Sequence, residues 1–76
     1  MDIKLKIALR IKELRENKGL TQEALAYKSD VDRTYMNHVE NGKRNISIIN
    51  LEKIIVNGLG ISMPDFFNVN AFDKTK

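Results

Sequence analysis

The sequence has 76 residues, 42% of them hydrophobic, and its 13 basic against 10 acidic side chains give a net charge of +3 and an isoelectric point near 9.3. A chain of this size supports one hydrophobic core, and the absence of cysteine excludes a disulfide framework and a thiolate metal site. Lysines interrupt the stretch "MDIKLKIALR" and the apolar runs are short, which argues against a signal peptide or membrane span and predicts a cytoplasmic protein. The basic excess slightly favours a polyanionic partner.

The first predicted helix covers about residues 3–17. Its apolar residues recur at the spacing of one helix face, and Gly19 follows as a stop signal. That face is formed by Ile3, Ile7, Ile11 and Leu14.

Two short helices with a very brief break between them come next. Thr21 can cap a helix that runs to about Lys28, and Asp32 can cap another over about 33–40, which Gly42 ends. The break "SDVD" is too short for a linker, and a connection of three or four residues between two-turn helices sets them at a steep angle. The pattern predicts a helix-turn-helix unit whose second helix faces outward.

The C-terminal half predicts two further helices. Ser47 can cap the segment "IINLEKIIV", which stops at "NGLG", while Ser62 and Pro64 can open a short helix in "SMPDFF". No strand pattern, repeat or low-complexity tract competes with these helices. We therefore expect an all-α, five-helix single domain.

The third helix carries a face rich in hydrogen-bonding groups. At about 100° per residue its apolar residues Met36 and Val39 face the core. The opposite face then presents Arg33, Thr34, Asn37 and His38. Arginine can donate two hydrogen bonds to guanine, asparagine can pair with adenine, and threonine offers a hydroxyl and a methyl. This combination is typical of side chains that read the DNA major groove.

The stretch "LRENKGLTQEALAYKSDVDRTYMNHVENGKRN" resembles the Cro/C1-type (XRE-like) helix-turn-helix domains of phage repressors and their bacterial relatives, with a likeness over about residues 7–67. Within that superfamily, "AYKSDVDRTYMNHVENGKRNISIINLEKI" is most similar to the controller proteins of restriction–modification systems. The resemblance implies a homodimer that binds palindromic operator DNA and regulates transcription, with the helix-turn-helix at about 21–41 and a dimerisation part at about 47–72 of the domain 1–76.

The resemblance also implies roles for individual residues. Together with the face described above, the base-reading set is Arg33, Thr34, Tyr35, Asn37 and His38. The phosphate-binding set is Gln22, Asn41, Lys43, Arg44 and Asn45. Arg15 and Glu40 match a pair that joins the first helix to the third. Two departures stand out: Asp30 occupies a turn position where the family often has glycine, and "KIIVNGLGIS" is one residue longer than the usual pattern.

Several of these residues also have a purely structural interpretation. Tyr35 could be a half-buried core residue whose hydroxyl meets only solvent, and Lys43 and Arg44 could form an ordinary solvated loop. The pair of Arg15 with Glu40 could be a loose surface contact. The single histidine, His38, lacks a partner for a metal site or a catalytic triad, so no metal and no catalytic residue is predicted.

The expectation of a dimer rests on surplus apolar residues. The fourth helix has more isoleucine and valine than one core-facing stripe requires, and the chain is too small to bury all of Phe66, Phe67, Val69 and Phe72. The predicted interface residues are Ile48, Ile49, Val56 and Phe67.

The leading functional prediction is a dimeric, sequence-specific DNA-binding regulator, the controller of a restriction–modification system. The alternatives are a phage repressor or Cro-like regulator, and an antitoxin-type module that covers a partner protein. An enzyme is the weakest hypothesis, because neither paired carboxylates in a cleft nor a phosphate-cradling glycine loop is evident. The expected partners are double-stranded operator DNA and a second copy of the chain, with RNA polymerase as a further candidate; no cofactor and no membrane are expected.

Overall fold

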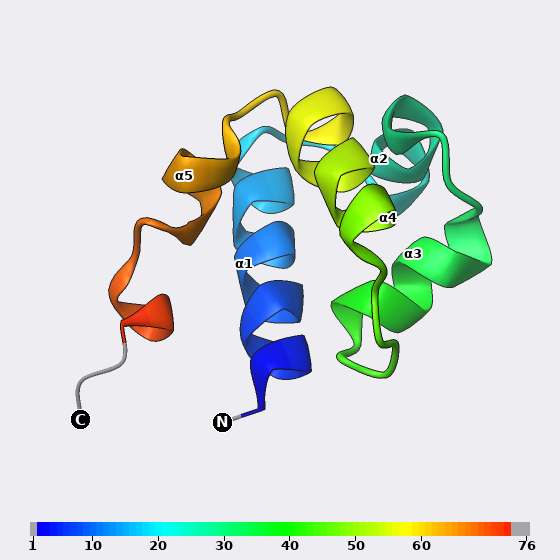
Figure 1. The fold of residues 1–76 in the computed structure, drawn as a ribbon. Helices are drawn as coiled ribbons and strands as arrows, with labels where there is room; N and C mark the ends of the chain where they lie inside the picture. Colours follow the sequence, from blue (N-terminus) through cyan, green and yellow to red (C-terminus); the bar gives the residue numbers. More distant parts are fainter. Residues whose placement is uncertain (1, 74–76) are drawn as a thin grey trace.

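In a computed structural model, which describes residues 2–73, the chain folds into an all-helical domain (Figure 1). The elements are α1 (Ile3–Asn17), α2 (Gln22–Ser29), α3 (Arg33–Glu40), α4 (Ile48–Glu52), a π-helical turn η1 (Lys53–Gly58), α5 (Met63–Phe67) and a 3-10 turn η2 (Asn70–Phe72). In Figure 1, α5 and the last turn lie on one side of α1, whereas α3 and α4 lie on the other. The prediction of an all-α fold with five α-helices is confirmed for the described residues.

Short polar side chains begin the α-helices. Thr21, Asp32, Ser47 and Ser62 each accept a hydrogen bond from a backbone N–H in the first turn of the helix that follows, as predicted. Asp2 does the same for α1. Because these bonds satisfy donors that the helix itself leaves free, they fix where each helix starts.

The turn between α2 and α3 depends on Asp30. This residue has a φ of 57° and ends α2 in the left-handed conformation, its N–H donating to the Tyr27 carbonyl at 3.1 Å. Aspartate tolerates this conformation better than most residues with a Cβ. The turn position at which the resemblance led us to expect glycine is therefore filled by a residue with a side chain.

The core is formed by one face of each major helix and by α5. Its fully or nearly fully buried hydrophobic residues are Ile7, Ala8, Ile11, Leu25, Ala26, Met36, Val39, Leu51, Ile54, Ile55, Leu59 and Phe66. On the predicted apolar face of α1, Ile7 and Ile11 are buried, whereas Ile3 is 56% exposed. Ala8, which the spacing argument omitted, is buried instead.

The fourth predicted helix divides into an α-helical start and the π-helical turn η1. Here the Leu59 N–H donates to the carbonyl of Ile54, five residues back, at 2.8 Å. A π turn accommodates one residue more than an α turn, and it lies in the segment that the resemblance led us to describe as one residue longer. The turn buries Ile54 and Ile55 in succession and brings Gly58 against α2.

The aromatic residues near the C-terminus form a small cluster. Phe66 is fully buried, and Phe67 and Phe72 meet edge to face with ring centroids 4.9 Å apart. Phe67, Val69 and Phe72 keep part of their surface exposed. Arg10 of α1 anchors the segment, since its Nε donates to the Phe66 carbonyl at 2.8 Å.

Gly58 allows the close approach of η1 and α2. A Cβ at this position would collide with Ser29 Oγ and lie 2.8 Å from Leu25 Cδ1. We expect Gly58→Ala to lower the free energy of unfolding by about 1–3 kcal/mol, the usual cost of overpacking a core, as measured by urea denaturation. Ser29 Oγ is buried without a hydrogen-bond partner, so the double variant Ser29→Ala/Gly58→Ala should regain part of the loss. A Gly58→Ala variant as stable as the parent would contradict this account.

Candidate nucleic-acid interface

Helix α3 turns its two faces to different surroundings. Met36 and Val39 are buried, at 0% and 3% exposure, while Arg33, Thr34 and Asn37 are exposed. The helix thus has the orientation that its sequence predicts, although His38 of the predicted polar face is half-buried. Gln22, at the start of α2, lies beside them: Gln22, Arg33, Thr34 and Asn37 line one open hollow of about 340 Å³.

A buried ion pair ties α3 to α1. Arg15 Nε lies 2.7 Å from Glu40 Oε2, Arg15 Nη2 lies 3.0 Å from Glu40 Oε1, and the Glu40 side chain is only 2% exposed. The remaining guanidinium nitrogen, Nη1, donates to the Leu20 carbonyl at 2.8 Å. This bidentate geometry is the strong form of an arginine–carboxylate contact, and the pair is not the loose surface contact considered as the alternative.

Amide side chains extend this pair to the surface. Gln22 Nε2 donates to Glu40 Oε1 at 3.2 Å, Asn37 Nδ2 donates to Gln22 Oε1 at 3.1 Å, and Asn41 Nδ2 donates to Asn37 Oδ1 at 3.2 Å. Two residues predicted to bind phosphate, Gln22 and Asn41, are thereby bonded to Asn37, which is predicted to read bases. These three contacts were not predicted from the sequence.

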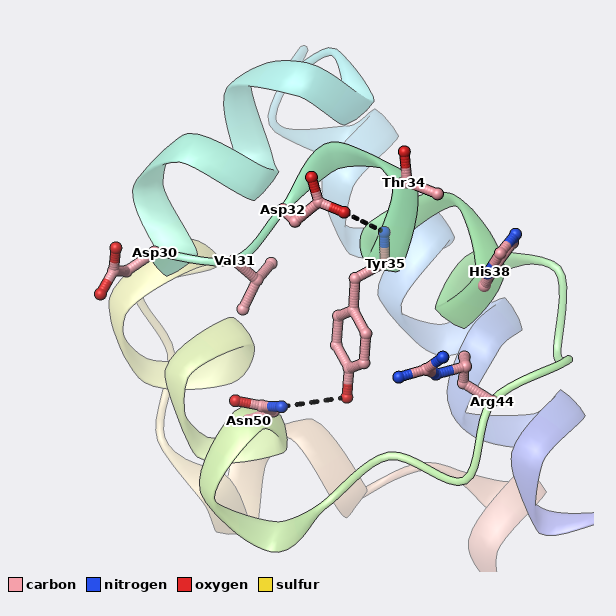
Figure 2. A pocket seen from close by; sticks show the side chains of 8 residues that line it. All are labelled: Asp30, Val31, Asp32, Thr34, Tyr35, His38, Arg44 and Asn50. Atoms are coloured by element: carbon pink, nitrogen blue, oxygen red, sulfur yellow. Dashed lines mark hydrogen bonds between the residues drawn. The ribbon is translucent and has the colours of Figure 1, made fainter.

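Tyr35 is half-buried and lies in a second hollow of about 430 Å³ (Figure 2). Its hydroxyl accepts a hydrogen bond from Asn50 Nδ2 at 3.2 Å, so it does more than meet solvent. The Arg44 guanidinium lies 4.8 Å from the centroid of the Tyr35 ring, within the range of a cation–π contact. Thr34 and His38 also line this hollow. Asn50, on α4, is a member of the site that sequence reasoning missed, because only the folded chain brings α4 to Tyr35.

The loop after α3 places four of the five predicted phosphate-binding residues on the surface. Asn41, Lys43, Arg44 and Asn45 are all exposed. The loop turns at Gly42, where φ is 72° and an added Cβ would lie 3.1 Å from Leu5 Cδ1 of α1. His38 is half-buried, and the described residues contain no group of three or more potential metal ligands.

The residues predicted to form a dimer interface lie on α4, η1 and α5, and Ile48 lines a hollow that also includes Asn45. Ile48 and Ile49 at the start of α4 are 80% and 70% exposed, and Val56 of η1 is 42% exposed. Phe67 is partly buried in the aromatic cluster. The exposed Ile3 adds to the apolar surface, since it lines a hollow together with Ile48.

Among residues 2–73, no helix has the length and hydropathy that crossing a membrane requires.

Two helices of eight residues, joined by a three-residue turn and with the second one displayed, define a helix-turn-helix protein. The Helix-turn-helix family matches residues 11–66 of the chain. Control protein C.MunI of Mycoplasma sp is 48% identical over 68 residues, which cover 88% of this chain and 90% of the relative. Control protein C.BamHI of Bacillus amyloliquefaciens is 35% identical, with coverage of 88% and 83%.

Among solved structures, the wild-type restriction–modification controller protein C.Esp1396I superposes with a TM-score of 0.82 and 45% identity, over 88% of this chain and 87% of that chain. The chain therefore belongs to the helix-turn-helix family and, within it, to the controller proteins of restriction–modification systems.

The pair of Arg15 with Glu40 should contribute strongly to the free energy of unfolding of the domain. Removing one partner leaves a buried charge unpaired, which costs about 3–5 kcal/mol, and a domain of this size has little stability to spare. We expect Glu40→Ala to lower the free energy of unfolding by that amount in urea denaturation, with strong coupling to Arg15→Ala in a double-mutant cycle. The control is Glu13→Ala in the pair of Arg10 with Glu13, whose glutamate is 60% exposed, and it should change stability by less than about 1 kcal/mol. Additive effects of Arg15→Ala and Glu40→Ala would contradict the coupling.

Proposed function

We propose that this chain is the controller protein of a restriction–modification system, a transcriptional regulator that binds a specific operator as a homodimer. The observation that carries the proposal is the exposed face of α3, which presents Arg33, Thr34 and Asn37. The end of this helix is fixed to α1 by the buried pair of Arg15 with Glu40. A rigid element with groove-reading side chains is the means by which helix-turn-helix proteins read DNA.

Solved complexes of a relative support the choice of ligand. C.Esp1396I has been crystallised as a tetramer with its natural 35 base-pair operator and also bound to a 25 base-pair operator site, and both structures share 45% sequence identity with this chain. By this likeness, operator DNA is the partner we assign to the α3 face.

The side chains divide into two roles. In the proposal, Arg33, Thr34, Tyr35, Asn37 and His38 contact base edges or the groove wall. Gln22, Asn41, Lys43, Arg44 and Asn45 contact phosphates. This division follows from position, since the first group lies along α3 and most of the second group lies in the loop beyond it.

Dimerisation follows from the exposed apolar residues of α4 and η1. Ile48, Ile49 and Val56 form a surface that a second copy can cover, and Phe67 adjoins the same half of the chain. A two-fold dimer doubles the contacts and selects a palindrome with half-sites about one helical turn apart. The proposal includes no catalytic activity, places the protein in the cytoplasm, and makes RNA polymerase the further partner if the bound dimer activates transcription.

Selection from randomised duplexes tests the proposal directly. The protein should enrich a palindromic sequence, with affinity that falls steeply as salt rises, because bound phosphates release counterions.

Arg33→Ala should weaken the binding free energy for the selected sequence by about 1–3 kcal/mol and relax the preference at one position, which we expect to be a guanine, in each half-site. Lys43→Ala should weaken all sequences alike and reduce the salt slope by about one. Enrichment of no sequence would favour the protein-interaction alternative, and an unchanged profile for Arg33→Ala would show that another residue reads that base.

Self-association tests the dimer. Ile49→Glu places a charge in the proposed interface, and we expect it to weaken the dimer by about tenfold or more in sedimentation equilibrium. Because Ile49 is 70% exposed in the single chain, the circular dichroism of the folded variant should be unchanged. Tyr27→Glu is a matched control, since Tyr27 is 86% exposed on α2, outside the proposed interface. A parent protein that stays monomeric at high micromolar concentration would rule out this model.

A further inference from the structure

An unbroken series of side-chain hydrogen bonds leads from the interior to the outer face of α3. It starts at Glu40, which is held by Arg15, and passes through Gln22 to Asn37 and Asn41. Each bond in the series beyond Arg15 measures 3.1–3.2 Å. The buried end is a carboxylate, and the other members are amides.

This composition fixes the direction of every bond. A carboxylate in an ion pair only accepts hydrogen bonds, whereas an amide can turn over and exchange its oxygen with its nitrogen. Glu40 therefore requires the NH2 group of Gln22, and the Gln22 oxygen must then face Asn37. Asn37 in turn must direct its NH2 group toward Gln22. The buried carboxylate thus sets the orientation of an exposed amide to which it is not directly hydrogen-bonded.

The series leaves Asn37 with the groups that adenine requires. Its amide has two N–H donors and an oxygen with two lone pairs, and the contacts with Gln22 and Asn41 use one of each. One donor and one acceptor remain on an exposed side chain. In the major groove, adenine presents an N7 acceptor beside an N6 donor. An amide turned the other way would place its donor against the adenine donor.

We infer that Asn37 reads an adenine in each half-site, and that Glu40 and Gln22 are positioning residues that set the amide orientation for this contact. The inference rests on the proposed function, because it needs a specific duplex as ligand. It gives Glu40 a role in sequence preference in addition to its role in stability.

The test compares base preferences after Glu40→Gln. A glutamine at this position can donate as well as accept, so it no longer imposes one direction on the series. In a randomised-duplex selection, we expect the adenine preference to fall by about fivefold or more at the position that Asn37→Ala also relaxes. The preference relaxed by Arg33→Ala should be retained. Glu13→Gln is the matched control, since it makes the same chemical change in the exposed pair with Arg10, and its profile should equal that of the parent.

A second readout needs no DNA. The side-chain amide resonances of Gln22 and Asn37 in the free protein should both shift in Glu40→Gln, although of these two amides Glu40 is hydrogen-bonded to Gln22 alone, and neither should shift in Glu13→Gln. An Asn37 resonance that does not move overturns the relay whatever the protein binds. A uniform loss of affinity with an unchanged profile overturns the role in specificity.

The two hypotheses can fail separately. If the parent protein selects no duplex, the proposed function fails together with the adenine contact, while the amide resonances still report whether the relay exists. If Glu40→Gln does not fold, Gln22→Ala interrupts the series and leaves the pair of Arg15 with Glu40 in place. It should then produce the same loss of adenine preference, and retention of that preference overturns the inference.

Discussion

The buried contact between Arg15 and Glu40 is the interaction on which the rest of the structure depends. It joins the end of α1 to the end of α3, and through the Leu20 carbonyl it also holds the connection to α2. Neither charge could be buried alone, because an unpaired ion in the interior carries a large desolvation cost. The three N-terminal helices are therefore obliged to meet in one arrangement, which leaves the polar face of α3 on the surface.

A second constraint acts from the other side of the helix-turn-helix unit. The π turn η1 packs on α2 through Gly58, with Ser29 and Leu25 as its close neighbours. The same turn directs Ile54 and Ile55 into the core and leaves Val56 exposed. The surface proposed for a second copy and the helix pair proposed for DNA are thus connected through η1, so packing within each chain fixes where the proposed reading helix lies relative to the proposed interface.

The features that could be predicted from the sequence are those with short-range causes. Caps such as Thr21 and Asp32 act within one helical turn, and the spacing of Met36 and Val39 was enough to orient α3. The pairing of Arg15 with Glu40 was expected only from resemblance, because no local pattern joins residues 25 apart. The π turn was not predicted, since its hydrogen bonds depend on packing against α2. The contact of Asn50 with Tyr35 was missed for the same reason: it depends on the path of α4. The roles assigned to individual side chains at the DNA face remain predictions.

The contact between Arg44 and the Tyr35 ring has a consequence for the entropy of association. A free arginine side chain loses up to about 2 kcal/mol of rotamer freedom when it is fixed, and a flexible loop loses more. Here the guanidinium already rests 4.8 Å from the ring centroid, and Asn50 holds the ring at its hydroxyl. Part of this ordering is completed when the chain folds, and it does not have to be repeated when a ligand arrives. In the proposed DNA contact, affinity at this surface is consequently linked to the integrity of the fold beneath it.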